Sequence, residues 1–205
     1  MKQLAIAVGA AFALWFLMFA PLTAPHLNFW LMMGGSALLL TTLASCFAPG
    51  WWRRLRLTPT ELLLGAAIAA ALWGIFWLGD RISGWLFDFA RPEVDAIYGM
   101  KEGFSPTTLS LLLLLLIGPA EEIFWRGYVQ EQLAQRWGAN RGLAVATALY
   151  TAVHIASCNF MLIMAALVAG TVWGVGYRFF PHRFTALVIS HALWDAAVFV
   201  WFPII

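Results

Sequence analysis

The sequence has few charged residues and almost no cysteine. Asp, Glu, Lys and Arg make up 11% of the 205 residues, whereas apolar residues make up 62%. Since a soluble domain is about half apolar and a quarter charged, this composition excludes an ordinary soluble protein. The net charge of +2 is too small to indicate a nucleic-acid partner. Two isolated cysteines, Cys46 and Cys158, make neither a disulfide framework nor a zinc site. We expect both to be small buried apolar residues.

Several catalytic motifs are also missing. The chain has no His-Glu-x-x-His zinc motif and no Gly-x-Ser-x-Gly nucleophile elbow. The Gly-x-Gly-Asp motif of aspartyl intramembrane proteases is absent, because the pair Gly79-Asp80 lacks the first glycine. No glycine loop for phosphates is present, so no nucleotide is implied.

Long apolar segments dominate the sequence instead. A membrane-spanning helix needs about 20 mostly apolar residues. The sequence therefore predicts an all-α, polytopic membrane helix bundle of about seven transmembrane helices, as one membrane-embedded domain over residues 1–205. We expect a multi-pass protein of a bacterial inner or plasma membrane, in contact with its lipids. The expected spans are 4–22, 27–48, 61–78, 107–133, 142–157, 160–177 and 184–202.

The distribution of lysine and arginine predicts a cytoplasmic N-terminus. With seven spans, three basic residues lie outside, namely Arg81, Arg91 and Lys101. The nine on the cytoplasmic side are Lys2, Arg53, Arg54, Arg56, Arg126, Arg136, Arg141, Arg178 and Arg183. The longest connection, 79–106, mixes acidic and aromatic residues. It favours an interfacial helix over 81–90, with a lid over the substrate as the alternative.

The most informative segment is Glu121-Glu122-Ile123-Phe124-Trp125-Arg126, which directly follows an apolar run. Each charge in hydrocarbon costs at least about 2.5–3.5 kcal/mol, so three charges here indicate a function. Glu122 and Arg126 are four residues apart and predict an ion pair on one helix. Adjacent helix positions point about 100° apart, which leaves Glu121 free to act as a general base. The alternative is an ion-pair network that only locks helices together.

Two later apolar segments carry histidines. Tyr150 and His154 share one helix face, and a lone histidine in a span is usually a packing residue. His191 and Asp195 also have the i, i+4 spacing, so the acid can fix the tautomer and orientation of the imidazole. A polar pair that only satisfies itself is the alternative. The spacing Gly170-xxx-Gly174 predicts close helix packing.

Taken in order, the motifs Glu-Glu-x-x-x-Arg, aromatic-x-x-x-His and His-x-x-x-Asp resemble the CPBP family. This family includes CAAX prenyl proteases of the Rce1 type, bacteriocin-processing enzymes and abortive-infection proteins. The resemblance covers about residues 105–202. It implies a membrane-embedded endopeptidase of the glutamic type.

The resemblance also implies roles for individual residues. Glu121 with His154 would activate the attacking water, His191 and Asp195 would line the oxyanion site, and Glu122 and Arg126 would hold the helix geometry. Two positions depart from the usual pattern, because Tyr150 stands where Phe is usual and Asp195 where Asn is frequent. A carboxylate donates no hydrogen bond unless it is protonated, so we assign the oxyanion contact to His191, oriented by Asp195.

Three alternatives stay open. A zinc-dependent protease could use Glu121, Glu122, His154 and His191 as ligands, although we expect no metal cofactor. A non-enzymatic immunity or scaffold protein would have no need of an intact Glu121, His154 and His191. A proton-coupled carrier is disfavoured because the chain has no internal repeat. The expected partner is a peptide or protein substrate: a prenylated CAAX-like tail, a bacteriocin leader or a membrane-anchor segment.

Overall fold

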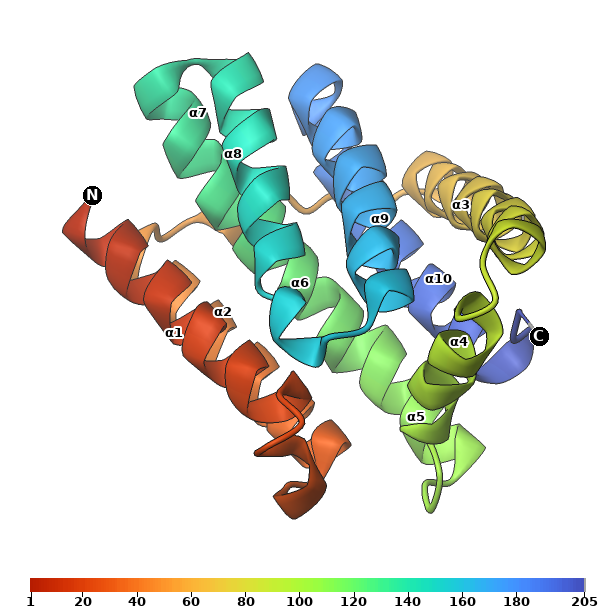
Figure 1. Ribbon diagram of the computed structural model, residues 1–205. Helices are drawn as coiled ribbons and strands as arrows, with labels where there is room; N and C mark the ends of the chain where they lie inside the picture. Colours follow the sequence, from red (N-terminus) through yellow and green to blue (C-terminus); the bar gives the residue numbers. More distant parts are fainter. Residues whose placement is uncertain (205) are drawn as a thin grey trace.

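The computed structural model describes residues 1–204, which form an all-α helix bundle without strands (Figure 1). The fold class predicted from the sequence is therefore confirmed. The α-helices are α1 Lys2–Phe19, α2 Phe29–Phe47, α3 Pro59–Leu86, α4 Ala90–Gly99, α5 Pro106–Leu112, α6 Gly118–Phe124, α7 Glu131–Trp137, α8 Ala139–Ala152, α9 Phe160–Phe179 and α10 Phe184–Ala196. Short 3-10 or π segments are η1 Ala24–His26, η2 Trp51–Arg54, η3 Leu113–Ile117, η4 Trp125–Gln130, η5 Ile155–Ser157, η6 Pro181–Arg183 and η7 Ala197–Trp201.

Within residues 1–204, six helices are long and apolar enough to cross a membrane, close to the seven predicted. The protein is thus a multi-pass membrane protein. The difference is the predicted span 142–157, where α8 has only 14 residues. At 1.5 Å per residue α8 is about 21 Å long, which is less than the roughly 30 Å of the hydrocarbon core. Its 3-10 continuation η5 turns the chain into α9 before α8 becomes a full span.

Helices α8 and α9 nevertheless run in opposite directions, α8 downward and α9 upward in Figure 1. The α7–α8 and α9–α10 connections lie at the upper end and carry Arg136, Arg141 and Arg183. The α1–α2 connection and the start of α5 lie at the lower end, where Lys101 precedes α5. The cytoplasmic location of the N-terminus stays a prediction.

The connection 79–106 differs from the predicted helix over 81–90. Helix α3 continues without a break to Leu86, and a separate helix α4 covers Ala90–Gly99. The prediction placed the helix too early because aromatic residues at 85–89 share the apolar character of α3. Helix α4 caps α9: the Glu93 carboxylate accepts a hydrogen bond from the backbone N–H of Met161 at 2.9 Å, and Asn159 donates to the Glu93 carbonyl at 2.8 Å.

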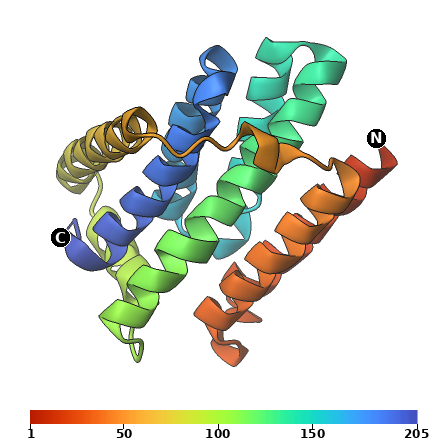
Figure 2. The same cartoon turned by 180° about the vertical axis from the view of Figure 1, so that it is seen from behind.

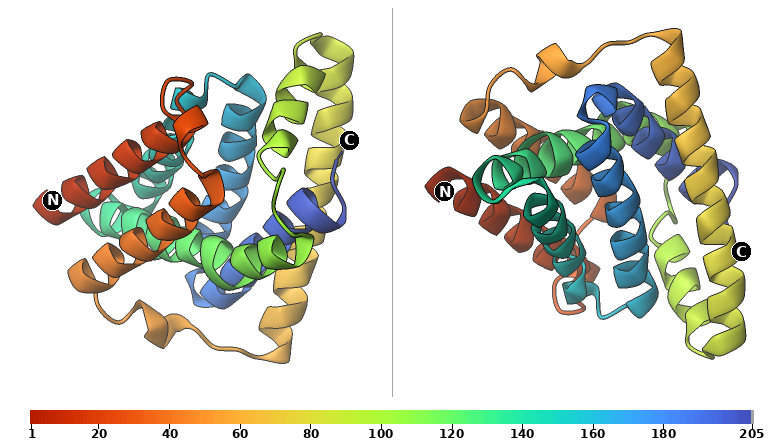
Figure 3. Two further views of the ribbon diagram at one scale, coloured as in Figure 1. Left: turned by 90° about the horizontal axis from the view of Figure 1, so that it is seen from below. Right: turned by 90° about the horizontal axis from the view of Figure 1, so that it is seen from above.

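A single 32-residue helix, Pro106–Trp137, forms the centre of the bundle. It lies between the α1–α2 hairpin and α3 (Figure 3). Two π segments, η3 and η4, interrupt it on either side of α6. Pro119 lies inside this helix and has no backbone N–H, so the wider turn of η3 accommodates a ring that would clash with a regular α-turn. π segments inside α-helices frequently mark functional sites, and these two frame the two glutamates.

Two apolar clusters flank this helix. One joins α1, α2 and α8 to it through residues such as Trp15 and Trp125, and the other joins α3, α9 and α10 through residues such as Trp173. Cys46 and Cys158 are exposed, so the prediction that both are buried is wrong. Cys46 lies on an outward face of α2, and Cys158 lies in the α8–α9 turn with a left-handed φ of 52°.

Seen from behind, the segment between α2 and α3 crosses in front of the central helix (Figure 2). Arg54 holds this segment in place, since its guanidinium donates to the Tyr177 hydroxyl at 2.5 Å and to the Gly127 carbonyl at 2.7 Å. The Tyr177 hydroxyl in turn donates to Glu131 at 2.8 Å. This connection therefore ties the central helix to α9.

Candidate active site

Glu122 is completely buried and bonded on two sides. The Arg126 guanidinium donates to Glu122 Oε1 at 2.9 Å, as the i, i+4 spacing predicted. Arg126 is only 2% exposed and has a second acceptor, the Gly170 carbonyl at 3.1 Å. Removing one member of a buried ion pair typically costs about 3–5 kcal/mol, so this pair has to stay intact in the folded protein.

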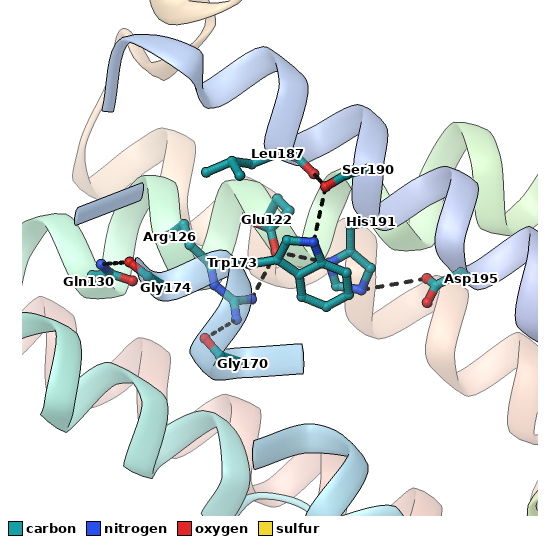
Figure 4. A network of polar contacts seen from close by, with 10 residues as sticks. All are labelled: Glu122, Arg126, Gln130, Gly170, Trp173, Gly174, Leu187, Ser190, His191 and Asp195. Carbon is teal, nitrogen blue, oxygen red and sulfur yellow. Dashed lines mark hydrogen bonds and ion pairs between the residues drawn. The ribbon is translucent and has the colours of Figure 1, made fainter. Parts of the chain in front are cut away.

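His191 lies between two carboxylates (Figure 4). Its Nδ1 lies 2.9 Å from Glu122 Oε1, and its Nε2 lies 3.6 Å from Asp195 Oδ2. The predicted neighbourhood of His191 and Asp195 is confirmed, but Glu122 is the closer partner and comes from another helix. Glu122 rather than Asp195 alone therefore orients the imidazole. Both ring nitrogens face groups that accept hydrogen bonds when ionised, which suits a doubly protonated ring.

Trp173 supports His191 from its flat side, a contact that the sequence did not predict. The two rings are stacked with centroids 3.7 Å apart and planes 14° apart. The Trp173 indole N–H donates to Ser190 Oγ at 3.0 Å, which fixes the indole. The Arg126 guanidinium lies over the same indole, 5.5 Å from its centroid. In the sequence, the one sign of this contact is a tryptophan among the small residues of α9.

The glycines of α9 bring that helix close to α8 and to side chains of the central helix. A Cβ at Gly170 would lie 2.7 Å from Tyr150 Cδ1, so only glycine fits without displacing the ring. The backbone carbonyls exposed by this close approach accept hydrogen bonds, from Arg126 at Gly170 and from Gln130 at Gly174, the latter at 2.8 Å. The predicted close packing is confirmed, and these glycines additionally provide acceptors. Gln130 was not predicted to take part.

A second close approach places His191 beside Glu122. A Cβ on Gly118 would lie 2.6 Å from Ala192 Cα, so the backbones of α6 and α10 nearly touch at this point. Glu122 lies one turn after Gly118, and His191 precedes Ala192. The small residue therefore sets the distance across which His191 reaches the glutamate.

Glu121 differs from its neighbour. It is 8% exposed and is bonded neither to Arg126 nor to His191, and its Oε2, like Oε2 of Glu122, is a buried atom without a hydrogen-bond partner among residues 1–204. The Tyr150 hydroxyl lies beside this carboxylate, and His191, Arg126 and Glu122 are its charged or ionisable neighbours. A buried carboxylate oxygen without a partner is costly, so it is a place where a water molecule or a substrate group would be bound.

His154 lies on the other side of Tyr150. The two rings have centroids 5.3 Å apart. Its Nδ1 lies 2.8 Å from the Tyr150 carbonyl, and its Nε2 accepts a hydrogen bond from the Trp15 indole N–H at 3.2 Å. Over the described chain His154 forms no hydrogen bond with Glu121. The structure thus joins Glu121, Glu122, Arg126, His191 and Asp195 in one cluster and places His154 at its edge, next to Tyr150.

The side chains named as zinc ligands do not converge. Over residues 1–204, no three His, Cys, Asp or Glu side chains are arranged to hold a metal ion. Glu122 is already bonded to Arg126 and His191, and His154 Nε2 accepts from Trp15. The four residues in this arrangement therefore do not fit a zinc site, and the use of a metal is a question for experiment.

Comparison with protein-family models gives one match. Residues 103–197 match the Type II CAAX prenyl endopeptidase Rce1-like family. This stretch is an Rce1-like segment. It contains every residue of the predicted site, which confirms the resemblance drawn from the three motifs. No curated protein and no solved structure matches the chain.

The match to the Rce1-like family indicates a membrane endopeptidase, and enzymes of this kind act on peptide or protein substrates at the membrane. The matched residues begin shortly before α5 and end at the start of η7. Helices α1 to α4 lie outside the match, although α1 contributes Trp15 to the edge of the site.

Proposed function

We propose that the protein is an intramembrane, glutamate-dependent endopeptidase in which Glu121 activates the attacking water. The observation that supports this most directly is the contrast between two adjacent glutamates. Oε1 of Glu122 is bonded to both Arg126 and His191, whereas the buried Glu121 carboxylate is bonded to neither, and Oε2 of each glutamate has no partner within residues 1–204. The charge of Glu122 is thus paired directly with Arg126 and His191, and the charge of Glu121 stays available for a proton from water.

In the proposed reaction, Glu121 takes a proton from water while the water oxygen forms a bond to the scissile carbonyl carbon. His154 would help to position this water. The carbonyl oxygen becomes an oxyanion, which the Nε2–H of His191 stabilises. The C–N bond then breaks, and the leaving nitrogen receives the proton from Glu121. No covalent acyl-enzyme is formed.

His191 suits the oxyanion role because its two nitrogens are held differently. The bond from Nδ1 to Glu122, at 2.9 Å, fixes the ring, and stacking on Trp173 prevents it from tilting. The Nε2 contact with Asp195, at 3.6 Å, is longer than a hydrogen bond. Nε2 can therefore donate to an oxyanion, and Asp195 orients the ring without competing strongly for that proton.

The proposed substrate is a peptide or protein tail held at the membrane, including a lipidated or membrane-anchored one. Burial of the site among apolar helices excludes bulk water, which strengthens the electrostatic interactions inside it. A substrate that is itself anchored in the bilayer reaches such a site without crossing bulk water.

The test is cleavage of a panel of membrane-tethered reporter peptides by the purified protein in detergent. We expect Glu121→Gln to abolish cleavage while the protein keeps its melting temperature, because Gln has the same size but accepts no proton. Glu102→Gln is the matched control, since Glu102 is exposed and lies outside the cluster. Cleavage by Glu121→Gln at the wild-type rate would refute the role of Glu121.

A chelator added to the wild type separates the two protease mechanisms. Unchanged cleavage with chelator supports the mechanism without a metal, whereas loss of cleavage that zinc restores supports the zinc alternative. If the wild type cleaves no peptide of the panel, the non-enzymatic scaffold becomes the better interpretation.

A further inference from the structure

The hydrogen bonds of His154 fix its protonation state. Trp15 has only an N–H to offer, so His154 Nε2 has to be the acceptor in the 3.2 Å contact. The Tyr150 carbonyl has only lone pairs, so Nδ1 has to carry the proton in the 2.8 Å contact. The pair of partners is compatible only with a neutral imidazole protonated at Nδ1.

This arrangement leaves no nitrogen of His154 free. If Nε2 were protonated, its N–H would face the N–H of Trp15, and the two donors would repel each other. A bond from Nδ1 to a backbone carbonyl is the usual way in which a functional histidine is oriented, with Nε2 left for the reaction. Trp15 therefore occupies the nitrogen that would otherwise bind a water molecule.

Trp15 belongs to the buried face of α1, together with Leu4, Ala7, Ala11 and Met18. This face packs on α2 and on the α8–α9 turn. The Phe19 ring lies against the same imidazole, with centroids 5.6 Å apart. His154 Nε2 thus points toward α1, and anything that reaches it has to come from that side.

Building on the proposed function, we propose that Trp15 closes the site on the α1 side. A peptide substrate then enters between α1 and the α8–α9 turn and displaces the indole. The indole N–H donates to Nε2 at the position where the O–H of the catalytic water donates during the reaction. When substrate displaces Trp15, the O–H of water replaces the indole N–H as the donor to Nε2. His154 therefore binds the catalytic water only when substrate is present.

Chemical modification of His154 tests this contact without any need for cleavage. Diethyl pyrocarbonate acylates an unprotonated imidazole nitrogen, and in wild-type protein Nε2 is covered by Trp15. We expect Trp15→Phe, which keeps an aromatic ring but removes the N–H, to speed up modification of His154 about fivefold, the effect of one ordinary hydrogen bond. Trypsin releases residues 142–178 with His154 as their single histidine and 184–205 with His191 as theirs, so mass spectrometry follows each separately.

Trp30→Phe is the matched control, because Trp30 is equally buried and donates its N–H to the Met100 carbonyl, away from His154. This control and the His191 peptide should show unchanged modification. An unchanged rate at His154 in Trp15→Phe would overturn the proposal.

The cleavage assay provides the second measurement. We expect Trp15→Phe to raise kcat/KM for a reporter peptide severalfold, because substrate no longer has to displace the N–H. A fall in kcat with faster modification of His154 would overturn closure and make Trp15 a residue that positions the histidine. If the wild type cleaves no peptide but Trp15→Phe still speeds up modification of His154, the proposed protease is refuted. The covering of His154 Nε2 by Trp15 is then still supported.

Discussion

Substitution of Gly118 by alanine is expected to separate His191 from Glu122. The new Cβ would lie 2.6 Å from Ala192 Cα and 2.8 Å from its backbone nitrogen. Both contacts are with backbone atoms, so no rotamer change relieves them. To restore ordinary van der Waals contact, α10 has to move by about 0.8 Å. A shift of this size lengthens the 2.9 Å bond between His191 Nδ1 and Glu122 beyond hydrogen-bonding distance.

The expected loss of stability follows from three contributions. Overpacking costs about 1–3 kcal/mol, and the lost hydrogen bond to a charged group costs about 1.5–3 kcal/mol. The higher helix propensity of alanine returns about 1 kcal/mol. The free energy of unfolding should therefore fall by about 1.5–5 kcal/mol, and the melting temperature by several degrees for a chain of this length.

Thermal unfolding in detergent, combined with the cleavage assay, measures both effects. Gly74→Ala is the matched control, since a Cβ there meets nothing within 4 Å and the substitution should be neutral or stabilising. We expect Gly118→Ala to lose at least tenfold in kcat. A Gly118→Ala protein with the stability and activity of Gly74→Ala would refute the inference that this close approach sets the geometry of the site.

Three further predictions concern other parts of the chain. Glu122→Gln removes the charge opposite Arg126, and we expect a loss of about 3–5 kcal/mol in the free energy of unfolding, measured by denaturant titration. Glu93→Ala removes the carboxylate that caps α9, and thermal unfolding should show a loss of about 1 kcal/mol. Burial raises the pKa of Tyr98 above its ordinary value of 10.0. The folded protein then keeps a proton that the unfolded chain loses above pH 10, so this contribution to stability is lost as the pH rises further. The melting temperature of Tyr98→Phe should fall less steeply above pH 10 than that of the wild type.

Contacts within one helix could be predicted from the sequence. The pairs Glu122–Arg126 and His191–Asp195 follow from i, i+4 spacing, which fixes neighbours along a helix whatever the tertiary fold. The apolar segments likewise predicted the membrane bundle, because their length is set by the thickness of the bilayer. The short α8 was not predicted, since its apolar pattern continues through the turn at 153–159 and hides its end.

Contacts between helices could not be predicted in this way. The bond from His191 to Glu122, the stacking of Trp173 on His191 and the bond from Trp15 to His154 each join separate helices. Their distances depend on which backbones approach closely, and periodicity in one sequence says nothing about this. Gly118 decides the first of these approaches, whereas several glycines elsewhere in the apolar helices have open space beside them. A glycine in an apolar span therefore does not by itself reveal a close approach.

The different roles that we propose for the two adjacent glutamates rest on the different charged groups that each of them contacts. Glu122 faces Arg126 and His191, so its negative charge is opposed by a guanidinium and an imidazole that it binds directly. Glu121 points about 100° away along the helix and lies within reach of these groups without a direct bond to either. In the proposed mechanism, the pairing of Glu122 leaves the negative charge of Glu121 to be neutralised by a proton from water. Exchanging the two roles would require the helix to turn by one residue, which the bond from Arg126 to Gly170 and the contact of Gly118 with α10 both prevent.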